Sequence, residues 1–174
     1  METRELPAFS RAYADATLAT LDGRPRDEAE QHLAECLKLL VIASAQPELL
    51  ITVSPELDSV WRALAVQTPS YLELCAHLPG GHPGRPRSQG RDAGGTDPTP
   101  EQSGRLVALY VQSFGPFTPR SALLWPAAQL VMGALRLGLS GLNDLGGGWD
   151  AGWSLPADSP WRRLGGVLRV SELA

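Results

Sequence analysis

Residues 27–46 read DEAEQHLAECLKLLVIASAQ and carry the clearest helical signal in the chain. Apolar side chains recur there every three or four positions: Leu33, Cys36, Leu37, Leu40 and Val41. This spacing places them on one face of a helix, and Pro47 favours an end just before it. Asp27, followed three residues later by Glu30, has the pattern of a capping box. The stretch therefore predicts an amphipathic helix that begins at an Asp27 cap.

A helix-start pattern recurs further along the chain. A Ser or Thr is followed by Pro at residues 54–55, 68–69 and 99–100. These residue types are favoured at the N-cap and at the first helical position. A looser helical spacing runs over residues 6–21, whereas residues 49–53 form a short apolar stretch that is either extended or a buried loop. The sequence predicts a mainly α fold.

Composition divides the chain into three parts. We expect an N-terminal helix and turn over residues 1–26, a helical core domain over 27–145, and a Gly/Trp-rich C-terminal segment over 146–174, flexible over 146–153. Residues 79–100 contain hardly any apolar side chain, so they cannot offset the entropy cost of ordering. They predict a flexible Gly/Pro-rich loop, either disordered or a functional lid. The expected fold is a small single-domain helical bundle with this long loop.

The apolar tract over residues 123–142 is long enough to raise the question of a membrane span. Pro126, Gln129 and Arg136 argue against one, as do the glycines within the tract. We expect a buried helix or a pair of helices. The alternative is an exposed face that either binds a ligand or joins two copies in a homodimer.

Charge and cysteine content narrow the class of protein. The 174 residues carry a net charge of -4, which argues against a nucleic-acid partner. Lys38 is the only lysine, so almost all of the positive charge is arginine, a bias typical of a GC-rich genome. Two cysteines do not make a disulfide framework, and no apolar signal-peptide core follows residues 1–5. We expect a cytoplasmic protein with no membrane partner.

The common catalytic signatures are absent: there is no G-x-S-x-G elbow, no phosphate-binding P-loop and no H-E-x-x-H helix. No motif implies a cofactor. The best candidates for chemistry gather around one predicted helix pair. The candidate catalytic residues are Asp58, Arg62, Tyr71 and His82. The candidate ligand-binding residues are Trp61, Thr68, Cys75, Tyr110 and Trp125.

Each of these residues also has a structural interpretation. Asp58 and Arg62, spaced i, i+4, form either a surface ion pair of about 0.2–0.5 kcal/mol or an anion clamp. The tyrosines and tryptophans either pack in the core or line a pocket. Cys75, His77 and His82 have zinc-compatible chemistry, but their spacing matches no standard module. Cys75 lies on an apolar face, so packing explains it better and no metal is predicted.

Several stretches resemble the glycine-rich domain-containing protein-like family, over about residues 28–126. They are DSVWR at 58–62, TPSYLELC at 68–75, GGHP at 80–83, YVQSFG at 110–115 and WP at 125–126. The family's histidine after the tryptophan is Arg62 here, and its double histidine before proline is reduced to His82. The family is mostly of unassigned activity, so the resemblance implies a fold more than a mechanism.

Two functions follow from these residues. The first is a non-catalytic binding or accessory protein that holds a small molecule, a peptide or a partner protein on the face formed by Trp61, Arg62 and Tyr71. The second is a small cofactor-independent tailoring enzyme of bacterial secondary metabolism, of the cyclase or isomerase type. It would use acid/base residues in a helical pocket.

Overall fold

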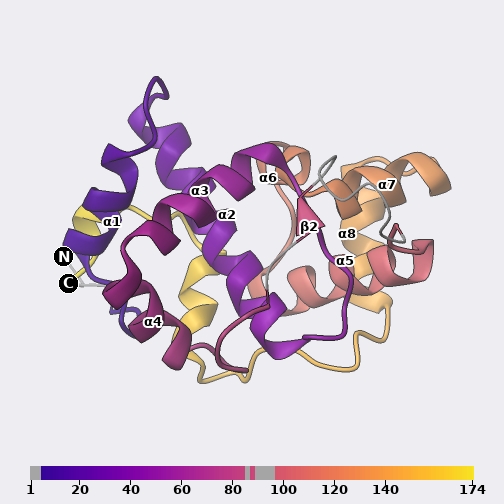
Figure 1. The fold of residues 1–174 in the computed structure, drawn as a ribbon. Coiled ribbons are helices and arrows are strands. Elements are labelled where there is room, and N and C mark those ends of the chain that lie inside the picture. Colours follow the sequence, from indigo (N-terminus) through magenta and orange to yellow (C-terminus); the bar gives the residue numbers. More distant parts are fainter. Residues whose placement is uncertain (1–4, 85–86, 89–96) are drawn as a thin grey trace.

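Helix α2 (Arg26–Ala45) runs through the middle of the molecule, and the other elements are arranged around it (Figure 1). The computed structural model describes residues 5–84, 87–88 and 97–174. Helices α1 (Arg11–Ala19), α3 (Pro55–Val66), α5 (Pro100–Phe114) and α6 (Pro119–Leu124) all pack against α2. The predicted small, mainly helical single domain is confirmed.

The predicted Asp27 cap is wrong, because α2 begins one residue earlier. Its N-cap is Pro25, which makes no side-chain cap bond, and Asp27 lies inside the first turn. There it faces the positive end of the helix dipole without accepting a cap bond. Glu30 instead accepts from Arg26 at 2.9 Å.

The N-terminal helix is shorter than the expected span of residues 6–21. Helix α1 begins after Ser10, whose hydroxyl accepts from the backbone N–H of Tyr13. Before it, Leu6 and Phe9 pair in a tight turn and are both buried. Ala8, between them, has a φ of 55°, which a helix does not allow.

Helices α3 and α4 (Thr68–Ala76) lie on one side of α2. Ser54 caps α3 as predicted, with Pro55 at the first helical position. Thr68 is not a cap: Gln67 precedes α4 without a side-chain cap bond. The stretch at 49–53 is extended at its end, since β1 (Thr52–Val53) pairs in parallel with β2 (Arg87–Ser88). The rest of the predicted loop over 85–96 lies outside the described residues.

Helices α5, α7 (Pro126–Leu135) and α8 (Leu139–Gly148) form the other side of the domain. Thr99 caps α5 in a capping box with Gln102. The tract at 123–142 is helical but broken: it covers the end of α6, all of α7 and the start of α8, and Arg136 adopts a left-handed conformation that ends α7. Its full burial was wrongly predicted, since three leucines are exposed: Leu123, Leu130 and Leu135. Within the described residues, none of the helices is long and apolar enough to cross a membrane.

The glycine run at 146–148 is helical, whereas the sequence suggested a flexible segment. Gly146 is buried where α8 crosses α5, and a Cβ there would lie 2.7 Å from Cγ2 of Val111. The run therefore permits a close helix contact. Beyond α8, the chain returns along α2 and α5 through the short 3-10 helix η1 (Pro160–Gly165), and the last one, η2 (Val170–Glu172), packs against α1.

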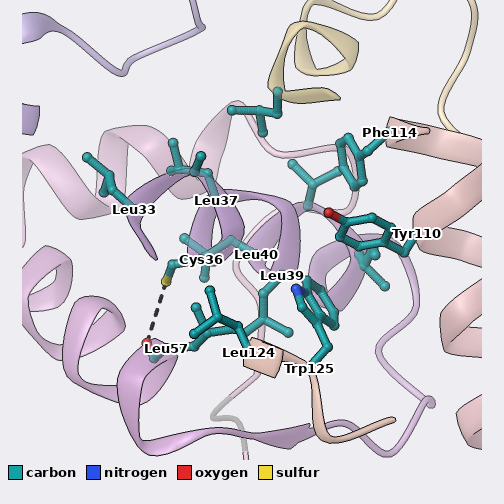
Figure 2. Close-up of a cluster of buried hydrophobic side chains, with 14 of the residues drawn as sticks. Leu33, Cys36, Leu37, Leu39, Leu40, Leu57, Tyr110, Phe114, Leu124 and Trp125 are labelled. Carbon is teal, nitrogen blue, oxygen red and sulfur yellow. Dashed lines mark hydrogen bonds between the residues drawn. The ribbon is translucent and has the colours of Figure 1, made fainter. Parts of the chain in front are cut away.

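Apolar side chains of α2 fill the core between the two sides of the domain (Figure 2). Leu33, Leu37 and Leu40 are fully buried. The Cys36 thiol donates to the backbone carbonyl of Leu57 at 3.7 Å, which links α2 to α3. Burial raises the pKa of Cys36, so its thiol stays protonated and packs as a small apolar group.

Gly146→Ala tests the close contact of α8 with α5. The added methyl group overlaps the stiff β-branched Val111, so we expect a loss of about 1–3 kcal/mol in the free energy of unfolding. The matched control is Gly147→Ala, one residue further along α8, where nothing lies within 4 Å of a Cβ. There the lower entropy of the unfolded chain should stabilise by about 0.4–1 kcal/mol. Urea unfolding measures both, and equal effects would contradict the contact.

His32, buried on α2, makes stability depend on pH. Arg24 Nη1 donates to Nδ1 of His32, so that nitrogen carries no proton. Burial and then the charge of Arg24 lower the pKa of His32. The folded protein therefore resists a proton that the unfolded chain accepts. The contribution of His32 to the free energy of unfolding is complete above the pKa of an unfolded histidine, about 6.5. It decreases as the pH falls below that value.

We expect His32→Asn to flatten this part of the pH profile, because an amide oxygen still accepts from Arg24 but does not titrate. Thermal unfolding followed between about pH 7.5 and 5.5 measures the effect. His77→Asn, at an exposed histidine, is the control. Parallel profiles for wild type and His32→Asn would show that His32 does not contribute.

Candidate functional site

A small cleft between α3, α4 and residues 82–84 collects most of the residues predicted to carry chemistry. Its volume is about 230 Å³. Trp61 and Tyr71 are buried beside it, and His82 is exposed. The lining residues are Asp58, Trp61, Arg62, Ala65, Tyr71, His82, Pro83 and Gly84. All four candidate catalytic residues therefore share one cleft with Trp61.

The local sequence explains this convergence. Trp61 and Arg62 follow Asp58 by three and four residues on α3, so both lie next to it on that side of the helix. The turn at Gln67 brings α4 back beside α3, which places Tyr71 next to Trp61. A sharp bend at Gly81, with a φ of 81°, follows α4 and leads into His82.

The aromatic side chains of the cleft are held in place by each other. Trp61 Nε1 donates to the Tyr71 hydroxyl at 2.8 Å. The Tyr71 and His82 rings meet edge to face, with centroids 5.7 Å apart and an interplanar angle of 86°. Burial is the largest of the causes that raise the pKa of Tyr71, which keeps its hydroxyl protonated near neutral pH. Tyr71 is therefore a hydrogen-bond donor rather than a base.

Asp58 and Arg62 form the predicted i, i+4 ion pair, with 2.9 Å between Oδ2 and Nε. The Arg62 side chain is 49% exposed, so the pair itself adds little to stability. Both side chains also line the cleft. The two interpretations of Arg62 are compatible, because the pair engages Nε and a guanidinium has further N–H donors on its terminal nitrogens.

The other predicted residues of this region lie outside the cleft. Thr68 is exposed, and its hydroxyl donates to the Ala65 carbonyl. Cys75 is buried, and burial raises the pKa of its thiol. His77 is exposed, with Nδ1 2.9 Å from the Glu73 carbonyl. Among the described residues, no three His, Cys, Asp or Glu side chains are grouped to hold a metal ion.

Tyr110 and Trp125 lie away from the cleft, on the opposite side of α2, and take part in a buried polar cluster. Trp125 Nε1 donates to Glu35 Oε2 at 2.9 Å, and the Tyr110 hydroxyl donates to the same carboxylate at 3.0 Å. Lys38 Nζ donates to Glu35 at 2.7 Å and to the Tyr110 oxygen at 2.9 Å. We call Glu35, Lys38, Tyr110 and Trp125 the Glu35 cluster.

The Glu35 cluster is deeply buried yet borders a cavity. The side chains of Glu35 and Lys38 are 5% and 7% exposed. With Tyr110 they form part of the lining of a cavity of about 360 Å³. Burial, and then the Glu35 charge, raise the pKa of Tyr110, so this hydroxyl also stays protonated. Lys38 lies 4.9 Å from the centroid of the Tyr110 ring, within cation–π distance.

Sequence reasoning missed Glu35 and Lys38. A signal was present: both are charged residues among the leucines of one helix, spaced i, i+3, and one is the only lysine of the chain. Their partners on α5 and after α6 are 72 and 90 residues away. The pattern within one helix therefore indicates the pair of Glu35 and Lys38, but it does not indicate their distant partners.

Comparison with known proteins adds no relative: the chain matches no protein-family model, no curated protein sequence and no solved structure.

Replacing Lys38 with Met tests the ion pair. It leaves the Glu35 charge buried without its cation, so we expect a loss of about 3–5 kcal/mol in the free energy of unfolding. In Glu35→Gln/Lys38→Met both charges are gone and the amide oxygen still accepts from Tyr110 and Trp125. We expect the double variant to be more stable than Lys38→Met alone. Urea unfolding measures both, and a double variant no more stable than Lys38→Met would contradict the pairing.

Proposed function

We propose that this protein is a non-catalytic binding protein whose cleft between α3 and α4 holds a compact planar small molecule with an anionic group. The supporting observation is that Trp61, Arg62, Tyr71 and His82 converge on one cleft. Its volume of about 230 Å³ is below the ~300–1,000 Å³ usual for drug-sized ligands. A single aromatic ring with one acidic substituent suits this space.

The roles of the side chains follow from their contacts. The buried faces and edges of Trp61 and Tyr71 supply apolar area, and the exposed His82 ring closes one side. The terminal guanidinium nitrogens of Arg62 donate to the anionic group, a charge-assisted contact that is stronger than a neutral one. Trp61 and Tyr71 are rigidly paired, so binding requires little ordering of the cleft.

Binding is a better explanation of the cleft than catalysis. The Tyr71 hydroxyl is protonated and bonded to Trp61, and Asp58 is paired with Arg62, so neither is placed as a free base. The tailoring-enzyme alternative draws on the same convergence of Asp58, Tyr71 and His82. In that case Tyr71 would be the proton donor. Family membership, a cytoplasmic location and a homodimer through 123–142 stay predictions.

Benzoate is the probe for this proposal. We expect it to raise the melting temperature of the wild type, because a ligand of the folded state stabilises it by mass action. Arg62→Ala should lower the affinity for benzoate about tenfold, the equivalent of losing one charge-assisted hydrogen bond. Benzamide, which has the ring but no charge, should bind the two proteins equally.

The control is Arg11→Ala, which removes another exposed arginine from an i, i+4 pair on a helix but lies outside the cleft. It should bind benzoate as the wild type does. Native mass spectrometry of the purified protein adds a direct reading of any retained small molecule. Unchanged benzoate affinity in Arg62→Ala would overturn the proposal.

A further inference from the structure

The cavity beside the Glu35 cluster has a polar floor and a charged rim. Glu35, Lys38 and Tyr110 lie at its buried end. Arg120 and Arg169, both exposed, lie at its open end. Residues 165–168, on the chain's return along α2 and α5, form another wall. The volume of about 360 Å³ falls in the usual range for small-molecule sites, ~300–1,000 Å³.

A gain in stability does not account for a charge pair at this position. Two ions taken out of water lose more hydration energy than their attraction usually returns. Apolar side chains of similar size would serve the packing of α2 against α5 as well or better. Because the Glu35–Lys38 pair also borders a cavity, it presents a fixed dipole to a ligand bound there.

The hydrogen bonds of the floor leave one donor for a ligand. An ammonium group has three N–H bonds. In the described part of the chain, Lys38 donates to two acceptors, Glu35 and Tyr110. The Glu35 carboxylate cancels the Lys38 charge at 2.7 Å and would repel a second anion. The group that suits the floor is therefore a neutral acceptor, such as a carbonyl oxygen.

The rim of the cavity, unlike its floor, suits a negatively charged group. Asp27 Oδ2 lies 3.9 Å from Arg120 Nη1, and Glu30 Oε1 lies 2.9 Å from Arg26 Nε. Each acidic residue of the rim is therefore paired with an arginine. None of the ion pairs between described residues involves Arg169. Its guanidinium suits an anionic group at the open end of the cavity.

We propose that this cavity is a second ligand site, for a small oxo acid. The ligand's neutral carbonyl oxygen accepts a hydrogen bond from Lys38 at the floor, and its carboxylate pairs with Arg169 at the rim. The apolar chain between the two groups lies against Ala34 and Leu168. The site is separate from the cleft between α3 and α4, with which it shares no lining residue.

The probes are 4-oxopentanoate and 7-oxooctanoate, each compared by calorimetry with the alkanoate of the same length, pentanoate or octanoate. We expect the better oxo acid to bind at least about tenfold more tightly than its alkanoate, because a hydrogen bond to a charged donor is lost in the alkanoate. Equal affinities of both oxo acids and their alkanoates for the wild type would overturn the proposal.

Variants separate the two ends of the site. Arg169→Ala should weaken oxo-acid binding about tenfold. The difference in affinity between this variant and the wild type should shrink at high salt. Glu35→Gln/Lys38→Met should abolish the preference for the oxo acid over the alkanoate. Arg11→Ala is the surface control and should bind like the wild type. Because Arg169 is exposed, its variant tests the site even if the double variant is unstable. Unchanged binding in Arg169→Ala would overturn the proposal.

Discussion

The burial of the Glu35 carboxylate is the constraint on which the arrangement of the domain depends. A buried charge is tolerated only when it is paired and hydrogen-bonded. Here the partners come from three places: Lys38 on the same helix, Tyr110 on α5, and Trp125 at the junction of α6 and α7. A shift of α5 or of that junction would deprive the buried carboxylate of one of these hydrogen bonds. Leucine packing along α2 has no comparable directionality, so the cluster fixes which positions face each other.

Much of the helical framework could be predicted from local sequence. The caps at Ser54 and Thr99 act over three or four residues, and they form as the sequence indicates. Asp27 failed as a cap because α2 begins at Arg26, and α1 begins late because Ala8 takes a left-handed turn. The prediction failed at Gly146 for another reason. A run of glycines indicates a flexible segment, but here Gly146 allows α8 to approach α5 closely. That contact depends on Val111, which lies in a different helix.

The candidate site was predictable where it is local. Asp58, Trp61 and Arg62 share one helix face, and Tyr71 lies on the next helix, so spacing was enough to group them. Tyr110 and Trp125 were chosen for their chemistry, but nothing in their neighbourhoods indicates that they meet Glu35 instead of the cleft. Long-range polar contacts of this kind require the packed helices to be known first. The same reason explains why Glu35 and Lys38 were missed.

The single lysine has a practical consequence. Apart from the α-amino group of the chain, Lys38 carries the only primary amine, and in the folded state its nitrogen is held between Glu35 and Tyr110. A small acylating reagent that enters the cavity must compete with these hydrogen bonds for the Lys38 nitrogen. The rate of acylation at this residue therefore reports how often the Glu35 cluster opens, without any engineered label. A ligand that fills the cavity would slow that reaction.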